Sequence, residues 1–329
     1  LLHGTMAQIQ QPQLSPSTCK TYRVQTTPLQ GFRWSLVFFH YLELRFSSGS
    51  QKKNFEYRCI RFIENLVGEA YNEEPAHLVH VMPQGPYIVT GASKGIGKAI
   101  ALEIAKQGHP VLALARASPE LEQIGIELTL LHPESRALAC DLSSDQDIAA
   151  VASQITAQSP WIAGIVHNAG TVEPILPLNQ VPIALWATSL QVNLIGVQDL
   201  TQRLMGNMGG EHQTRITTIS SGASLNPVES WSSYCVAKAG LDMWARCIAQ
   251  EGAELKISAI SIAPGIVDTN MQHTIRSVQP EHFPRHADFV SLQASGQLTQ
   301  ASDVALQLCP LILNHSMEQS GQRFDVREL

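Results

Sequence analysis

The chain has no long basic run, no Cys-x-x-Cys pair and no apolar run long enough to cross a lipid bilayer. Its apolar stretch at 34–42 is far shorter than the roughly 20 residues that a membrane helix needs. A net charge of −6 argues against nucleic acid as the main partner, and the lack of paired cysteines argues against a zinc site. We therefore expect no membrane span, no nucleic-acid partner and no metal.

Cysteine is scarce and scattered, and the histidines do not cluster. The six cysteines are Cys19, Cys59, Cys140, Cys235, Cys247 and Cys309. Cys140 and Cys247 fall in apolar surroundings, which predicts reduced core residues, as in a cytoplasmic protein. His282 and His286 have helical spacing, but Pro284 between them would disrupt a helix.

The sequence changes character at Met82. Residues 1–82 show no sustained helical or strand period and predict a poorly structured extension, such as sequence translated from upstream of a natural start at Met82. Five arginines between Arg23 and Arg61 would suit a transit peptide, but six glutamates between Glu43 and Glu74 argue against one. With 44% hydrophobic residues in the chain, residues 83–329 are enough for one α/β domain with a sizeable core.

Apolar strands alternate with amphipathic helices throughout residues 83–329. Strands are predicted near 87–90, 111–115, 137–140, 164–168, 215–220, 257–262 and 322–326. Helices are predicted near 95–107, 145–156, 183–205, 235–251 and 302–312. This alternation predicts a single domain of the Rossmann-like, doubly wound α/β class, with a parallel sheet of about seven strands between two helical layers.

A glycine-rich loop joins the first of these strands to the first helix. In Thr90-Gly91-Ala-Ser-Lys-Gly95-Ile-Gly97, Gly91 permits a tight turn, Gly95 lets the backbone approach a pyrophosphate, and Gly97 allows helix and strand to pack closely. An ordinary strand-to-helix turn is the plainer interpretation of this spacing. The preceding strand and the following helix favour a dinucleotide site.

The residue after the second strand indicates which dinucleotide binds. A carboxylate at this point would accept hydrogen bonds from the ribose 2′-OH of NADH, but the chain has Arg116 there instead. An arginine suits the 2′-phosphate of NADPH, and Lys94 in the glycine loop adds a second positive charge. Both could be solvated surface cations, but their joint placement favours NADPH/NADP+.

Three residues suggest a proton-transfer site. Tyr234 and Lys238 are four residues apart on a predicted helix and so share one face, and Ser221 lies thirteen residues before Tyr234. A lysine ammonium beside a phenol favours the phenolate, so we expect Lys238 to lower the pKa of Tyr234. Tyr234 would donate a proton to a carbonyl oxygen that Ser221 holds as a second donor.

Together these motifs resemble the short-chain dehydrogenase/reductase family over about residues 83–329. One departure is His167, where the family often has asparagine. The matching residues, in the family's order and at its spacings, are Thr90 to Gly97, Asp141, Asn168-Ala169-Gly170, Asn193, Ser221, Tyr234 with Lys238, and Pro264-Gly265.

The resemblance implies a catalytic set and a cofactor site. The implied catalytic residues are Asn193, Ser221, Tyr234 and Lys238, with Asn193 ordering a water that links Lys238 to solvent. The implied cofactor-binding residues are Gly91, Ser93, Lys94, Gly95, Ile96, Gly97, Arg116, Asp141, Leu142, Asn168, Ala169, Gly170, Tyr234, Lys238, Pro264, Gly265, Val267 and Thr269. A homodimer or homotetramer formed through the helices near 183–205 and 235–251 is also implied.

The substrate pocket should be apolar and partly aromatic, under a lid from Met271 to Gln297, with no arginine cluster for a charged group. Its expected lining is Val172, Ala223, Leu225, Pro227, Trp231, Met271, His273, Ile275, Phe283 and Phe289. The stretches 168–174 and 263–272 resemble fungal benzil reductases, which are close to sepiapterin reductases. This implies reduction of an aromatic 1,2-diketone to an α-hydroxyketone, whereas Glu173 would suit a pterin-like substrate.

Two further hypotheses remain open. A reductase of 3-oxoacyl thioesters would need a basic docking patch for a carrier protein, and none is obvious in this acidic chain. A non-catalytic NADPH-binding regulatory protein would not need the proton donor Tyr234. The sequence therefore favours an NADP-dependent oxidoreductase that acts on CH–OH groups and a small-molecule carbonyl substrate.

Overall fold

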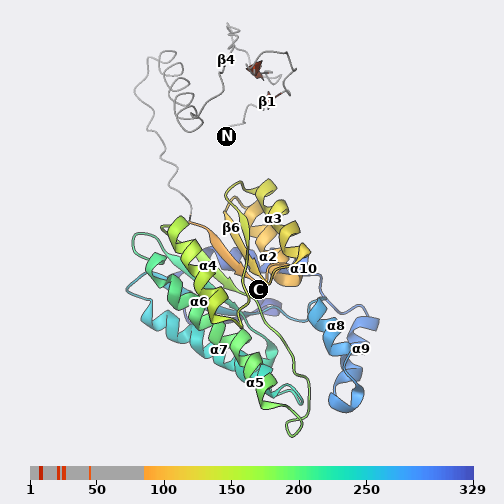
Figure 1. Ribbon diagram of the computed structural model, residues 1–329. Coiled ribbons are helices and arrows are strands. Elements are labelled where there is room, and N and C mark those ends of the chain that lie inside the picture. Colours follow the sequence, from red (N-terminus) through yellow and green to blue (C-terminus); the bar gives the residue numbers. More distant parts are fainter. Residues whose placement is uncertain (1–6, 10–20, 23, 27–43, 46–84) are drawn as a thin grey trace. The chain divides into compact units, whose positions relative to one another are not determined.

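The computed structural model describes residues 7–9, 21–22, 24–26, 44–45 and 85–329 (Figure 1). The chain divides into two compact units, Leu1–His80 and Val81–Leu329. In the first unit, β1 (Ala7–Ile9) pairs antiparallel with β3 (Val24–Thr26), and β2 (Thr21–Tyr22) pairs antiparallel with β4 (Leu44–Arg45). The predicted extension at residues 1–82 lies mostly outside the described residues, so it stays a prediction.

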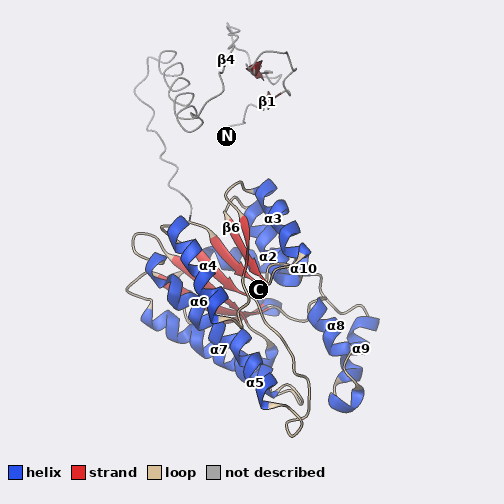
Figure 2. Ribbon diagram, in the orientation of Figure 1, coloured by secondary structure: helices blue, strands red, loops and turns tan. Residues whose placement is uncertain are grey.

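The second unit is built on a seven-stranded sheet whose neighbouring strands are all parallel, as predicted (Figure 2). The strand order is β11-β10-β9-β8-β5-β6-β7, so the chain reverses direction across the sheet between β5 and β8. The strands are β5 (Tyr87–Thr90), β6 (Val111–Ala115), β7 (Arg136–Ala139), β8 (Gly164–His167), β9 (Thr214–Ile219), β10 (Ile257–Ala263) and β11 (Arg323–Asp325). In such sheets, ligands bind beyond the carboxyl ends of the strands at the reversal point.

Helices cover both faces of the sheet, and each face has its own apolar core. On one face lie α2 (Gly95–Lys106), α3 (Pro119–Leu131) and α10 (Ala301–Asn314). On the other lie α4 (Asp145–Gln158), α6 (Gly196–Leu204) and α7 (Ser232–Glu251). The predicted doubly wound α/β class is therefore confirmed. None of the helices in the described part of the chain is long and apolar enough to cross a membrane.

The structure adds helices that the sequence analysis did not predict. Helix α3 begins with a capping bond, since the Ser118 side chain accepts from the Leu121 amide at 3.3 Å, and Pro119 occupies its first position. The lid region contains α8 (Asn270–Arg276) and α9 (His286–Ala294), which Figure 1 shows at one side of the domain.

The helix predicted at 183–205 is interrupted. Helix α5 (Ile183–Leu190) passes into a π-helical turn at Gln191–Ile195 before α6 begins at Gly196. Such turns are rare and often mark functional sites. This one contains Asn193.

Candidate active site

The glycine loop adopts the conformation that close approach of a ligand requires. Gly91 and Gly95 have φ angles of +66° and +58°, in the left-handed region that favours glycine. A Cβ atom added to Gly95 would lie 3.3 Å from Cγ2 of Thr269, across the opening of the loop. A Cβ added to Gly97 would lie 2.5 Å from the Gly91 carbonyl oxygen, so α2 and the loop pack too closely for any side chain there.

Asn168 fastens this loop to the end of β8. Its Nδ2 donates to the carbonyl of Thr90 at 2.9 Å and to that of Gly91 at 3.3 Å. The Thr90 hydroxyl in turn accepts from the backbone amides of Asn168 and Ala169, both at 3.0 Å. These hydrogen bonds join the glycine loop to the end of β8. Gly170, which follows, lines the cavity beside this junction.

Arg116 and Asp141 line a cavity that the glycine loop also lines. Arg116 is exposed at the end of β6. Asp141 accepts from the amide and the hydroxyl of Ser143 at 2.9 and 2.7 Å. Burial raises the pKa of Asp141, but the bonds from Ser143 and the charge of Arg116 outweigh it, so the pKa lies below its usual value. Asp141 is therefore an ionised acceptor near a cation.

Tyr234, Lys238 and Ser221 meet where β9 ends against α7. The Lys238 ammonium donates to the carbonyl of Ile219 at 2.7 Å and lies 5.7 Å from the centre of the Tyr234 ring. The Ser221 hydroxyl oxygen accepts from the Ala223 amide at 3.2 Å, so its own proton remains available for donation. The three side chains line one cavity.

The pKa of Tyr234 differs from the prediction. Burial raises it to about 12, and a hydrogen bond with Ser221 lowers it by less. Burial also lowers the pKa of Lys238 to about 8, against the charge of Asp242. Burial of both side chains therefore dominates the pKa of Tyr234, and the lowering expected from Lys238 stays a prediction. The folded protein holds Tyr234 as the protonated phenol at neutral pH.

Asn193 is buried in the π-helical turn and connects it to the loop after β8. Its Nδ2 donates to the carbonyls of Thr171 and Ser189 at 2.9 and 2.8 Å, and its Oδ1 accepts from the Thr171 amide at 3.0 Å. These bonds fix Asn193 against the loop after β8. A Cβ atom added to Gly170 would lie 2.7 Å from Asn193 Oδ1, so this position has no room for a side chain. The structure gives Asn193 a bracing role, and its predicted water-ordering role stays a prediction.

An aromatic cluster stands beside Tyr234. Trp231, just before α7, lies edge-on to Tyr234 with ring centres 5.5 Å apart. Its other contacts are Phe283, stacked at 5.4 Å, and Phe289, at 5.5 Å. Because all four rings are buried, the cluster fixes the orientation of the phenol and forms an apolar wall.

One cavity of about 1470 Å³ holds nearly all the predicted site residues. Gly97 and Asn193 do not line it, because they lie behind the glycine loop and the loop after β8. The predicted residues that line it are Gly91, Ser93, Lys94, Gly95, Ile96, Arg116, Asp141, Leu142, Asn168, Ala169, Gly170, Ser221, Tyr234, Lys238, Pro264, Gly265, Val267 and Thr269. A long cavity with an open glycine loop at its wall fits a dinucleotide.

The substrate end differs in detail from the prediction. Val172, Ala223, Trp231, Met271, Ile275 and Phe289 line the cavity as expected. The others do not line it as expected: Leu225, Pro227 and His273 are exposed, and Phe283 is completely buried behind Trp231.

Sequence analysis missed two arginines at this end, Arg285 and Arg327. They do not form a free cationic patch, since Arg285 pairs with Asp288 at 3.0 Å and Arg327 pairs with Asp325 at 2.8 Å. The sequence held a signal for both, because each arginine is within three residues of its aspartate.

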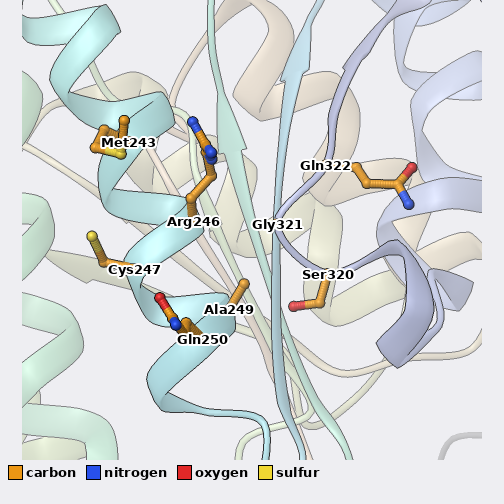
Figure 3. Close-up of a pocket in the computed structure, with 8 residues that line it drawn as sticks. All are labelled: Met243, Arg246, Cys247, Ala249, Gln250, Ser320, Gly321 and Gln322. Carbon is orange, nitrogen blue, oxygen red and sulfur yellow. The ribbon is translucent and has the colours of Figure 1, made fainter.

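A second, shallower pocket of about 420 Å³ lies away from Tyr234 (Figure 3). Figure 3 shows it between the later turns of α7 and the turn before β11, with Cys247 among its lining residues. The prediction that Cys247 is a core residue is wrong, because the core-facing residues of α7 here are Ala245 and Ile248. Cys140 is buried, as predicted. Among the described residues, no three His, Cys, Asp or Glu side chains form a metal-binding group.

Comparison with known proteins agrees with this geometry. The family described as short chain dehydrogenase matches residues 87–280. The chain is 32% identical to the benzil reductase ((S)-benzoin forming) of Bacillus subtilis, over 74% of this chain and 98% of that protein. It is 30% identical to a 3-oxoacyl-[acyl-carrier-protein] reductase of Pseudomonas aeruginosa, over 66% of this chain and 85% of that one.

The crystal structure of the KRED1-Pglu enzyme has a similar fold. Its TM-score is 0.67 at 29% identity, and the match covers 73% of this chain and all of that one. The family match spans the glycine loop and the tyrosine–lysine pair. This chain therefore belongs to the short-chain dehydrogenase family of oxidoreductases.

Proposed function

We propose that this protein uses NADPH to reduce one carbonyl of a hydrophobic or aromatic 1,2-diketone, giving the α-hydroxyketone. The observation that carries the proposal is the position of the Tyr234 phenol, in a cavity that the glycine loop and the aromatic side chains also line. The similarity to a benzil reductase supports the choice of substrate.

In the proposed reaction, the cofactor supplies a hydride to the carbonyl carbon. Negative charge then grows on the carbonyl oxygen, and Tyr234 donates its phenolic proton to that oxygen. Ser221 donates a second hydrogen bond to the same oxygen, since its hydroxyl proton is not used in the bond that it accepts from the Ala223 amide. The Lys238 ammonium, 5.7 Å from the centre of the Tyr234 ring, stabilises the phenolate left after proton transfer.

The direct test is turnover of benzil and of a 3-oxoacyl thioester in parallel, each with NADPH and with NADH, followed by loss of the reduced cofactor's absorbance. We expect benzil to be reduced with NADPH, with only slow reaction in the other three combinations. Turnover of the thioester alone would contradict the proposed substrate. Turnover of benzil with NADH at an equal rate would contradict the proposed cofactor.

The proposed preference for NADPH depends on Arg116. We expect the Arg116→Ala variant to bind NADPH about 10- to 100-fold more weakly, because a charge-assisted hydrogen bond to the 2′-phosphate contributes about 1.5–3 kcal/mol. Its affinity for NADH should stay the same, which fluorescence titration of both cofactors measures. Arg136→Ala is a matched control, since Arg136 is also exposed at a strand but does not line the cavity. An equal loss for NADH would show that Arg116 acts on the fold instead.

A pterin-type substrate is a second candidate, favoured by Glu173. This exposed carboxylate lines the cavity two residues beyond Thr171, whose hydroxyl accepts from the Glu173 amide at 3.1 Å. A carboxylate in this position could accept hydrogen bonds from the amino group of a pterin. The apolar wall of Trp231 and Phe289 on the other side favours the diketone.

We further propose a cytoplasmic homodimer or homotetramer. Exposed apolar side chains on α5, the π-helical turn and α7 would be covered by a second subunit. They are Ile183, Leu185, Ile195, Val236 and Met243. Contacts between α5 and α7 within one chain place these residues on adjacent helices.

A further inference from the structure

An ion pair joins the last strand of the sheet to the catalytic helix. Arg323 in β11 donates through Nε to Oδ2 of Asp242 in α7, with 3.1 Å between the atoms. The exposed fractions of the two side chains are 22% and 14%, so water screens this pair less than it screens a surface pair. The pair connects residues 81 positions apart in the sequence.

Each partner also reaches the reacting centre. Nη2 of Arg323 donates to the backbone carbonyl of Ser221 at 3.2 Å, so the guanidinium holds the turn that presents the Ser221 hydroxyl. Asp242 lies one helical turn after Lys238, on the same face of α7, and its charge favours the ammonium form of Lys238. Oδ1 of Asp242 is buried without a hydrogen-bond partner, so its negative charge is incompletely neutralised.

Among the described residues, Asp242 is the charged side chain that acts on Lys238 in this way. On α7 the titratable neighbours of Lys238 are Tyr234 and Cys235 in the preceding turn and Asp242 in the following turn. The groups that approach from other elements are neutral, namely the Ile219 carbonyl of β9 and the Asn193 amide of the π-helical turn. Arg323 of β11 contacts Asp242.

We propose that Asp242 and Arg323 are positioning residues for the carbonyl reduction proposed above, with Arg323 fixing the Ser221 turn and Asp242 supplying negative charge beside Lys238. Neither residue touches the reacting atoms. The inference rests on the proposed function only for its kinetic consequence, because the charge state of Lys238 can be measured in the protein without cofactor.

The test is competitive acylation of lysines in the full chain without cofactor, read by mass spectrometry across a pH series. The midpoint for Lys238 should fall by at least about half a pH unit in Asp242→Asn, because a stabilising charge is removed. In Arg323→Gln it should rise, since Asp242 then loses its cationic partner. A purely structural role would not move the midpoint in opposite directions.

Kinetics provide the second measurement. The upper pH limit of kcat should move with the Lys238 midpoint in both variants, while KM for the ketone changes less than kcat. Asp242→Glu should restore the wild-type profile, because it keeps the charge. Asp199→Asn is the matched control, since Asp199 forms a 2.7 Å pair with Arg203 on α6, away from the cavity.

Two results would overturn the inference: an unchanged Lys238 midpoint in both variants, or the same shift in Asp199→Asn. If Asp242→Asn does not fold, the upward shift in Arg323→Gln decides alone. If the wild-type protein does not reduce benzil, the proposed substrate is wrong. The acylation midpoints still decide whether Asp242 and Arg323 set the charge of Lys238.

Discussion

The Tyr234→Phe variant is expected to lose about three orders of magnitude in turnover and still bind NADPH. A positioned general acid typically contributes about 10²- to 10⁴-fold to a rate, and Tyr234, which lines the cavity with Ser221, is the proposed proton donor. The change removes one oxygen and leaves the ring against Trp231, so the aromatic wall should stay intact. Single-turnover kinetics and fluorescence titration of NADPH measure the two effects separately.

Tyr87→Phe is the matched control for this variant. Tyr87 is another buried tyrosine, but it belongs to the core under α10 and its hydroxyl is 3.5 Å from the Leu313 carbonyl. Loss of the Tyr87 hydroxyl should leave turnover unchanged. Full activity of Tyr234→Phe would favour a protein that binds NADPH without using this phenol, and the proposed mechanism would then be wrong.

The second large effect is a loss of stability in mild acid. His167 is completely buried, with Nε2 2.9 Å from the Thr201 hydroxyl and no partner for Nδ1. Burial lowers its pKa from 6.5 to about 3, and burial also lowers the pKa of His315 to about 4. Below pH 6.5 the unfolded chain therefore binds protons that the folded protein does not, so the free energy of unfolding falls.

Each histidine should remove about 2 kcal/mol of stability between pH 7 and pH 5, or about 4 kcal/mol for both. The contribution is fully present above pH 6.5 and is lost progressively as the pH falls toward the folded-state pKa values of about 3 and about 4. Urea unfolding at intervals of pH measures this loss. The window lies above the lowered pKa values of Asp141 and Asp325, so these carboxylates contribute little to it.

The His167→Asn variant tests the assignment. Asparagine does not titrate, and its amide can still bond to Thr201, so the loss between pH 7 and pH 5 should be about 2 kcal/mol smaller. His273→Asn is a control on an exposed histidine, which should leave the pH dependence as it is. A wild-type protein whose stability is flat across this window would contradict the prediction.

Much of the fold could be predicted because its strands are short buried runs. All seven strands of the sheet lie within two residues of the predicted ranges, since Tyr87–Thr90 and its counterparts are apolar segments bounded by turn residues. Helix α3 was missed although Ser118 and Pro119 mark its start, because its outward face carries apolar Ile126 and Leu130 and weakens the amphipathic pattern.

Part of the candidate site could likewise be predicted from the sequence, and part could not. Ser221 was predicted from its spacing to Tyr234, and in the structure its hydroxyl forms the hydrogen bond that lowers the pKa of Tyr234. The direction of the Tyr234 pKa shift could not be predicted, because it depends on how deeply Trp231 and the lid bury the ring. The pair of Asp242 and Arg323 is equally hidden in one sequence, since helix and strand meet only in the folded sheet.

The strand order also determines the sequence in which the strands can pair during synthesis. Strands β5, β6 and β7 can pair as soon as they leave the ribosome, but the other edge of β5 has to wait for β8, which begins at Gly164. Until then a buried-type apolar strand, Tyr87–Thr90, presents an open edge that invites pairing with other chains. Synthesis past His167 thus pairs this open edge of β5 and brings Asn168 against Thr90 beside the glycine loop in the same step.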